Sequence, residues 1–190
     1  MPKFILNSNE LVVLEETTLL GAVLRSDLSW SSNTAYLVKR ANTKLWCLRR
    51  LKKFGASPTD LLDVYFKQIR SILEYAVPVW HPGLTGEDRL EIERVQKSAL
   101  CIILGQNYKS YRAALKTLAI ETLFQRRQKL CGKFAKKSSK HPKFSKWFKP
   151  KLSSRACTRQ KPKQCHEVYA RTCRFKESPI SYLTDILNKK

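Results

Sequence analysis

The sequence lacks the long apolar run, the glycine-rich loop and the catalytic groupings that mark several common functional classes. Its longest uninterrupted apolar stretch, residues 99–104, has six residues, whereas a membrane-spanning helix needs about 20. The six glycines are scattered and form no phosphate-binding loop. The three histidines fall in no Ser/His/Asp or Cys/His grouping of the kind used in nucleophilic catalysis. We therefore expect neither a membrane protein nor an enzyme of these classes.

Acidic residues are scarce, and they are scarcest in the last third of the chain. The 190 residues include 37 Lys and Arg against 15 Asp and Glu, which gives a formal net charge of +22. Residues 126–190 hold 20 of the basic residues and 3 of the acidic ones. A charge this far from balance indicates a polyanionic partner. We expect that partner to be nucleic acid, DNA or RNA, and we expect no membrane partner.

The beginning of the chain does not read as a secretory signal, because three glutamates in the first sixteen residues interrupt it. Six cysteines at irregular spacings, without such a signal, indicate reduced thiols. The protein is therefore expected to be nuclear or cytoplasmic and not secreted.

Hydrophobic periodicity predicts a small β element followed by helices. Short, alternating stretches at residues 4–6, 11–14 and 18–24 indicate strands. From about residue 32 to residue 54, apolar side chains recur every three or four positions, which is typical of an amphipathic helix. Further helices are expected at residues 57–76, 85–104, 110–118 and 121–137, with a connection at residues 77–85.

Local end signals support these helices. Ser57 and Thr85 can cap the second and third helices, and the third would end before Gly105. After residue 149 few apolar residues remain to offset an ordering cost of about 1 to 2 kcal/mol per residue. The predicted fold class is α+β, mainly α. Its parts are a β hairpin or sheet remnant at 1–30, a bundle of four to five helices at 31–149, and a basic, largely disordered tail at 150–190 with a short C-terminal helix.

A row of basic side chains marks the predicted helix at residues 121–137. The row recurs at three or four positions and comprises Arg126, Lys129, Lys133, Lys136, Lys137 and the following Lys140, while Leu123, Leu130, Phe134 and the aliphatic part of Arg127 form the other face. Downstream, Lys143 and Lys146 alternate with Phe144, Trp147 and Phe148. Such cations suit phosphates, and exposed rings can stack on bases at roughly 1 to 3 kcal/mol each. The alternative is a solvated helix face whose neighbouring rings close the bundle.

Four residues of zinc-ligand type occur in the tail: Cys157, Cys165, His166 and Cys173, spaced C-x7-C-H-x6-C. Zinc sites usually pair two cysteines at C-x2-C or a similar spacing. Because that pairing is not found, the four are a weak metal candidate, and a structural or incidental role is favoured. Cys47, Cys101 and Cys131 fall on apolar helical positions and are expected in the core. No metal and no cofactor is predicted.

A further set of blocks runs through most of the chain: Leu20 and Gly21, Trp30, Lys-Arg-Ala-Asn at 39–42, Leu-Arg-Arg-Leu at 48–51 and Ile-Leu-Glu-Tyr at 72–75. In this order they resemble the post-catalytic palm and thumb of LINE-type (non-LTR) retrotransposon reverse transcriptases, and the resemblance extends through 89–104 and 126–135. Such thumbs are helical bundles that follow the minor groove of the template and primer duplex. The resemblance implies that further residues contact the nucleic-acid backbone, namely Lys39, Arg40, Arg49, Arg50, Lys52 and Lys53.

The resemblance also implies that the chain does not polymerise. In the family, the fingers and the metal-binding carboxylates precede these blocks, and neither Ala-Asp-Asp nor Tyr-x-Asp-Asp occurs in this sequence. Asp27, Asp60, Asp63 and Asp88 are spread over separate predicted elements, whereas two-metal catalysis needs carboxylates that converge. We expect a truncated, non-catalytic fragment.

Residues 20–55 also resemble the short N-terminal domain of the alkylation-repair AlkB-homologue family, whose members elsewhere carry an iron and 2-oxoglutarate oxygenase and a methyltransferase. The sequence contains no His-x-Asp with a distant His for iron, and no glycine-rich turn after a strand for S-adenosylmethionine. This resemblance describes a small module and implies neither activity.

Two functions follow as hypotheses. The first is a non-catalytic nucleic-acid-binding fragment, derived from a reverse transcriptase, that grips phosphates through basic helix faces. The second is a protein-interaction or nuclear-targeting module, in which the bundle docks a partner and the basic tail directs import. Truncation would also expose apolar surface through which the chain self-associates or binds a protein partner.

Overall fold

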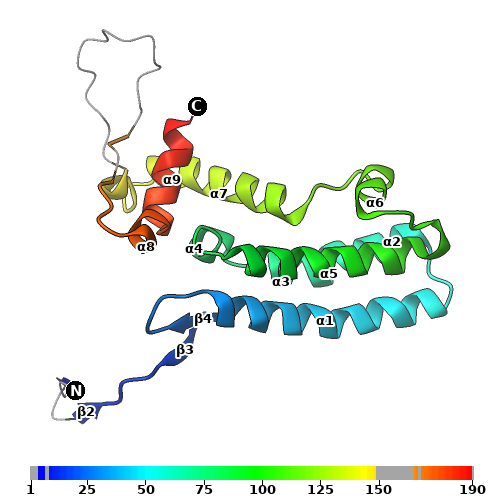
Figure 1. Cartoon of the computed structure of the whole chain (residues 1–190), viewed down its shortest axis with the longest axis horizontal. Coiled ribbons are helices and arrows are strands. Elements are labelled where there is room, and N and C mark those ends of the chain that lie inside the picture. Colours follow the sequence, from blue (N-terminus) through cyan, green and yellow to red (C-terminus); the bar gives the residue numbers. More distant parts are fainter. Residues whose placement is uncertain (1–3, 7–8, 149–164, 167, 190) are drawn as a thin grey trace, which may run out of the picture.

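The computed structural model describes residues 4–6, 9–148, 165–166 and 168–189, and it confirms a mainly helical fold with a small N-terminal β element (Figure 1). The strands are β1 (Phe4–Leu6), β2 (Asn9–Leu11), β3 (Glu16–Leu19) and β4 (Ala22–Arg25). The longer helices are α1 (Ser31–Lys53), α5 (Gly86–Leu104), α7 (Leu123–Lys140) and α9 (Pro179–Asn188). The shorter ones are α2 (Pro58–Val64), α3 (Ser71–Leu73), α4 (Val77–Trp80), α6 (Tyr111–Thr117) and α8 (Cys173–Lys176).

The strands form two separate antiparallel hairpins, β1 with β2 and β3 with β4. Residues 18–24, expected as one strand, instead turn back, because Leu20 and Gly21 have positive φ angles of 48° and 79° that make a tight turn. The strand expected at 11–14 lies earlier, as β2. The Val23 amide donates to Oδ1 of Asn33 at 3.0 Å, and the Tyr75 hydroxyl donates to the Leu20 carbonyl at 2.7 Å. These bonds tie the second hairpin to the helices.

The predicted helix ends are confirmed by their hydrogen bonds. Oγ of Ser57 accepts from the Asp60 amide at the start of α2, and Thr85 forms a reciprocal capping box with Asp88 at the start of α5. Gly105, with φ of 55°, follows the last residue of α5. These ends were predictable because each depends on residues three or four positions apart.

The second helix and the connection after it differ from expectation. A π-helical segment, η1 (Tyr65–Arg70), joins α2 to α3, and α3 ends at Leu73 ahead of Ala76, whose φ is 51°. Residues 77–85 are not only a connection, because they contain α4. Pro78 stands in the first turn of α4, where its missing N–H costs nothing. Trp80 is buried and its indole donates to the Tyr75 carbonyl at 2.7 Å, so α4 adds to the core.

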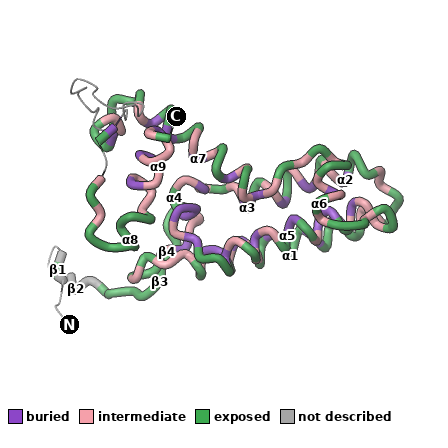
Figure 2. Tube along the Cα trace, turned by 45° about the horizontal axis from the view of Figure 1, so that its top comes forward, coloured by how far each residue is buried: buried purple, intermediate pink, exposed green. Residues whose placement is uncertain are grey.

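The core lies between α1, the α2–α3 segment (residues 58–73) and α5. Its fully buried apolar side chains include Leu37, Leu45 and Leu48 from α1, Leu61, Ile69 and Leu73 from the α2–α3 segment, and Ile92, Leu100 and Ile103 from α5. Figure 2 shows the buried positions on the facing sides of these helices. Burying each such side chain contributes about 1.5 to 3 kcal/mol. Tertiary packing therefore stabilises the helices more than their intrinsic propensity does.

The C-terminal helix belongs to the folded body, whereas the sequence placed it in a largely disordered tail. Leu183 and Leu187 of α9 are buried, and Ile186 lies against Gly132 of α7. Of the rest of the predicted tail, residues 150–164 and 167 lie outside the described residues, while residues 173–176 form α8. Over the part of the chain that is described, no helix has the length and apolarity to cross a membrane.

Candidate nucleic-acid interface

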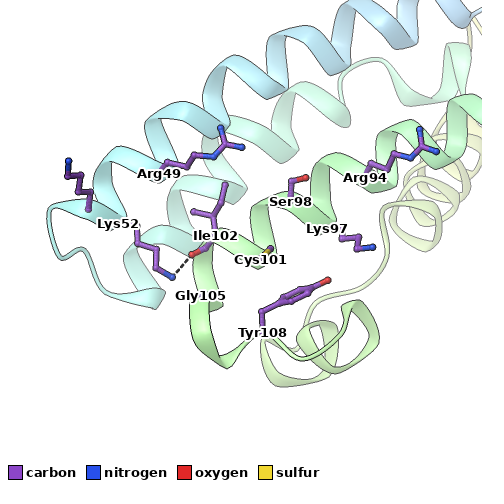
Figure 3. Close-up of a pocket in the computed structure, with 10 residues that line it drawn as sticks. Arg49, Lys52, Arg94, Lys97, Ser98, Cys101, Ile102, Gly105 and Tyr108 are labelled. Atoms are coloured by element: carbon purple, nitrogen blue, oxygen red, sulfur yellow. Dashed lines mark hydrogen bonds between the residues drawn. The ribbon is translucent and has the colours of Figure 1, made fainter.

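A groove between α1 and α5 gathers basic side chains from two helices. Five of the residues that line it are basic: Arg49, Lys52 and Lys53 from α1, and Arg94 and Lys97 from α5. Figure 3 shows Arg49, Lys52, Arg94 and Lys97 around the groove, with Cys101, Ile102 and Tyr108 among its other lining residues. No acidic residue lines this groove among the described residues, and none of the five cations forms an ion pair there. We call these five residues the α1–α5 groove.

The charge of the groove originates in two stretches without acidic residues. No Asp or Glu occurs between Asp27 and Asp60, which covers all of α1, or between residues 94 and 120. Arg49 and Lys53 are four residues apart and Arg94 and Lys97 are three apart, so each pair shares one side of its helix. Packing α1 beside α5 then brings the two basic sides together.

The groove continues along α1 as a second hollow that shares Arg94 and Ser98 with the first. Lys39 and Asn42 of α1 line this part, together with Glu91 of α5. Lys39 therefore extends the basic lining of the groove, and the continuation also contains one carboxylate, that of Glu91.

Lys52 has a structural partner. Its ammonium donates to the carbonyl oxygens of Ile102 and Ile103 in the last turn of α5, the latter at 3.0 Å. A lysine at a helix C-terminus satisfies carbonyl groups that have no partner within the helix. Lys52 therefore holds α1 to α5 at the end of the groove, a role that the sequence did not indicate.

Arg40 and Arg50 lie outside the groove and stack on aromatic rings of α1. The Arg40 guanidinium is 5.4 Å from the Tyr36 ring centre, and that of Arg50 is 5.5 Å from the rings of Trp46 and Phe54. Such contacts contribute about 0.5 to 1 kcal/mol at exposed sites. Of the six cations that the resemblance implied, four line the groove or its continuation and two do not.

The basic row of α7 is exposed from Lys129 onward, Arg126 is half-buried, and these first two members are engaged in ion pairs. Arg126 donates to Glu74, the residue just after α3, at 2.8 Å, and Lys129 pairs with Glu121. The hydrogen bond with Glu74 raises the pKa of Arg126, and that from Lys129 lowers the pKa of Glu121. These contacts join α7 to the residues before it, so both cations have a structural role.

The rest of the row has no ion-pair partner among the described residues. Lys133, Lys136, Lys137 and Lys140 are all exposed, and their spacing places them on one side of α7. We call these four the α7 row. Lys133 borders a hollow that also includes Phe66 and Arg70 of η1, so the row begins beside the α2–α3 segment.

Of the aromatic residues after α7, one is packed in the core and another is exposed where it could stack on a base. Phe148 is buried and closes the end of the bundle, whereas Trp147 keeps 46% of its surface exposed. The Trp147 and Phe144 ring centres are 5.0 Å apart, as are those of Phe144 and His141. Lys143 and Lys146 are exposed beside them. An exposed ring flanked by cations is suited to stacking on a base.

Arg127 is buried whole, whereas the sequence predicted burial of its aliphatic part only. Its exposed fraction is 0%, and no described residue accepts a hydrogen bond from its guanidinium. The pKa of Arg127 is lowered, because the effect of burial exceeds the opposing effect of the nearby Glu93 carboxylate. Glu93 itself accepts from the Tyr111 hydroxyl and the Phe124 amide, both at 2.6 Å. The contact between α5 and α7 is therefore partly polar.

The weak zinc candidate is not assembled by the described residues. Cys165 is buried while His166 and Cys173 are exposed, and no cluster of three or more metal-ligand side chains is found in the described ranges. Cys157 lies outside those ranges. The expectation for the helical cysteines was right for Cys131, which is buried, and wrong for Cys47 and Cys101, which are exposed. Cys101 is exposed because it faces the groove.

Comparisons with protein-family models, with curated proteins and with solved structures found no match. The resemblances to a reverse-transcriptase thumb and to the AlkB-homologue domain therefore stay predictions.

Proposed function

We propose that this chain binds nucleic acid without catalysing a reaction, and that it holds the phosphate backbone in the α1–α5 groove and along the α7 row. The observation that carries the proposal is the groove: five cations from two helices line one concave surface that no described carboxylate enters. The origin from a reverse transcriptase belongs to the same proposal and rests on the sequence blocks alone.

The chemistry of the groove favours phosphate over a base edge. Lysine and arginine that neutralise phosphates release condensed counterions, which makes the affinity fall steeply with salt. Arg49 and Arg94 can each donate two parallel hydrogen bonds to one phosphate. The lining has few polar groups besides its cations, so it offers little to distinguish one base from another. We therefore expect weak sequence preference.

The test is binding of the full chain to a fluorescent DNA duplex and to a single-stranded RNA, with salt varied between about 50 and 200 mM. We expect the affinity to fall by orders of magnitude over that range. A groove variant carrying Arg49→Glu, Lys53→Glu and Arg94→Glu should bind about tenfold more weakly or worse, with a shallower salt dependence. Lys52 is left unchanged because it stabilises the fold.

The matched control reverses three exposed lysines that line neither basic surface: Lys44→Glu, Lys67→Glu and Lys116→Glu. Both variants change the net charge equally, so a difference between them reports location and not total charge. Circular dichroism checks that each stays helical. Absence of binding at micromolar protein, or equal loss in both variants, would contradict the proposal.

A second function, protein association, is favoured by the exposed apolar side chains of the N-terminal segment. Val12 and Leu20 are 82% and 85% exposed, and Val13, Leu14 and Leu19 are also largely exposed. Contiguous apolar exposure of this kind is typical of interaction sites. The test is the mass in solution of the full chain and of a Val12→Asp, Leu14→Asp variant. An oligomer that the variant reduces to a monomer would support self-association, and a monomer in both would count against it.

A further inference from the structure

We infer that the protein can hold two nucleic-acid segments at once, one in the α1–α5 groove and one on the α7 row, and thereby bridge separate molecules. This inference rests on the proposed function, because each surface must first bind a phosphate backbone. It goes further because binding alone requires only one of the two surfaces.

The two surfaces are separate in the fold. The groove and its continuation are lined by α1, α5 and the residues just after α5, and no residue of the α2–α3 segment contributes. The hollow at the start of the α7 row is lined instead by Phe66 and Arg70 of that segment, together with Ala119, Ile120, Glu121, Leu123, Arg126, Lys129 and Lys133. Figure 2 shows the α2–α3 segment along one side of the α1 and α5 pair. The hollow that Lys133 borders therefore lies against a different element from the groove.

Each surface also has its own charge. The groove has five basic residues, and the α7 row has four, followed along the chain by the exposed Lys143 and Lys146. The hollow beside Lys133 shares no lining residue with the groove or with its continuation. A stiff duplex seated in the groove therefore leaves the α7 row free for a second duplex. A net charge of +22 also limits the repulsion between two bound polyanions.

The experiment captures one duplex by another. A biotinylated DNA duplex of about 20 base pairs is fixed on streptavidin beads, and a fluorescent duplex of unrelated sequence is added with the full chain at low salt. Wild-type protein should retain the fluorescent duplex on the beads. A large excess of protein should release it, because each duplex then acquires its own protein molecule.

Two variants separate the surfaces, and each is titrated from low to excess protein so that the maximum of its bridging curve is compared with that of wild type. The groove variant is the one above, and the row variant carries Lys133→Glu, Lys136→Glu and Lys140→Glu. Each should still bind one duplex while capture of the second falls about tenfold or more. The variant with Lys44, Lys67 and Lys116 reversed should bridge like wild type.

The outcomes distinguish this inference from the proposed function. Binding of single duplexes without wild-type bridging would overturn the inference and leave the proposed function in place. Absence of any binding would overturn both. Bridging that persists in the row variant would also overturn the inference, because it would arise from dimers of a protein with one binding surface. Loss of bridging in both surface variants but not in the control supports it.

Discussion

The Lys52 ammonium group donates a hydrogen bond to the carbonyl oxygen of Ile103 across 3.0 Å. The bond joins residues that are 51 positions apart, and it satisfies a carbonyl at the end of α5 that has no partner within the helix. The same side chain also packs against Gly105, where an added Cβ would clash with its Nζ atom. One lysine of the groove is thus part of the fold, while its neighbour Lys53 is exposed.

Replacing Lys52 should therefore lower stability, and replacing Lys53 should not. Lys52→Met removes the bonds to α5 and should reduce the free energy of unfolding by about 1 kcal/mol. Lys53→Met should change it by less than about 0.5 kcal/mol. Urea denaturation followed by circular dichroism measures both. Equal effects of the two substitutions would contradict the structural role of Lys52.

The ion pair between Arg126 and Glu74 should show measurable coupling. Both side chains are partly buried and their atoms are 2.8 Å apart, so we expect a coupling free energy of about 1 kcal/mol in a double-mutant cycle with Arg126→Met and Glu74→Gln. The control cycle is Lys67 with Asp63, a pair that is 72% and 66% exposed and should couple by less than about 0.5 kcal/mol. A larger value for the exposed pair would refute the prediction.

Stability should fall on acidification because of His81, which packs edge-on against the rings of Phe124 and Tyr182. Burial, with the charges of Arg127 and Arg89, lowers the pKa of His81 from 6.5 to about 4. The folded protein thus favours the neutral ring. This contribution is complete above pH 6.5 and is lost as the pH falls from 6.5 towards 4, by about 3 kcal/mol in all.

His81→Gln isolates this contribution, because glutamine does not titrate in that range. Urea denaturation at pH 7 and at pH 4.5 should show a smaller loss of stability on acidification for the variant than for wild type. The contribution of the carboxylates to this loss cancels in the comparison, because they titrate in both proteins. An identical loss in the two proteins would show that His81 titrates normally in the folded state.

Nucleic acid in the groove should protect Cys101 from alkylation. Cys101 is exposed and lines the groove, whereas Cys47 is exposed on α1 and does not line it. Peptide mass spectrometry after brief treatment with N-ethylmaleimide should show slower labelling of Cys101 when duplex is bound and no change at Cys47. Equal protection of both cysteines, or of neither, would place the nucleic acid elsewhere.

Local signals explain which parts of the fold were predictable. The start of α2 at Ser57, the capping box at Thr85 and the end of α5 before Gly105 follow from residues within one turn. The turn at Leu20 and the short helix α4 were missed for the opposite reason. Leucine rarely adopts positive φ, and two prolines near a glycine indicate a connection unless a buried residue such as Trp80 anchors them.

The candidate interface was only half visible in the sequence. The α7 row could be read from its spacing, because a helix places such residues on one side whatever surrounds it. The groove could not be read from spacing, because Arg49 and Arg94 come from helices that meet only after folding; its α1 residues were implied by the resemblance, and Arg94 and Lys97 were missed. Cys101 was assigned to the core on the same periodicity, and the packing of α1 left it at the open edge.

By itself, the sequence determined the helical class, most helix ends, the excess of positive charge and the exposed side of α7, since each depends on composition or on neighbours within a few residues. Tertiary structure alone decided which cations are engaged and which are free. It assigned Lys52 to the end of α5, Arg126 to Glu74 and Arg127 to the interior. The physical reason is that a charged side chain finds its partner across the fold, and no local pattern in the chain specifies that partner.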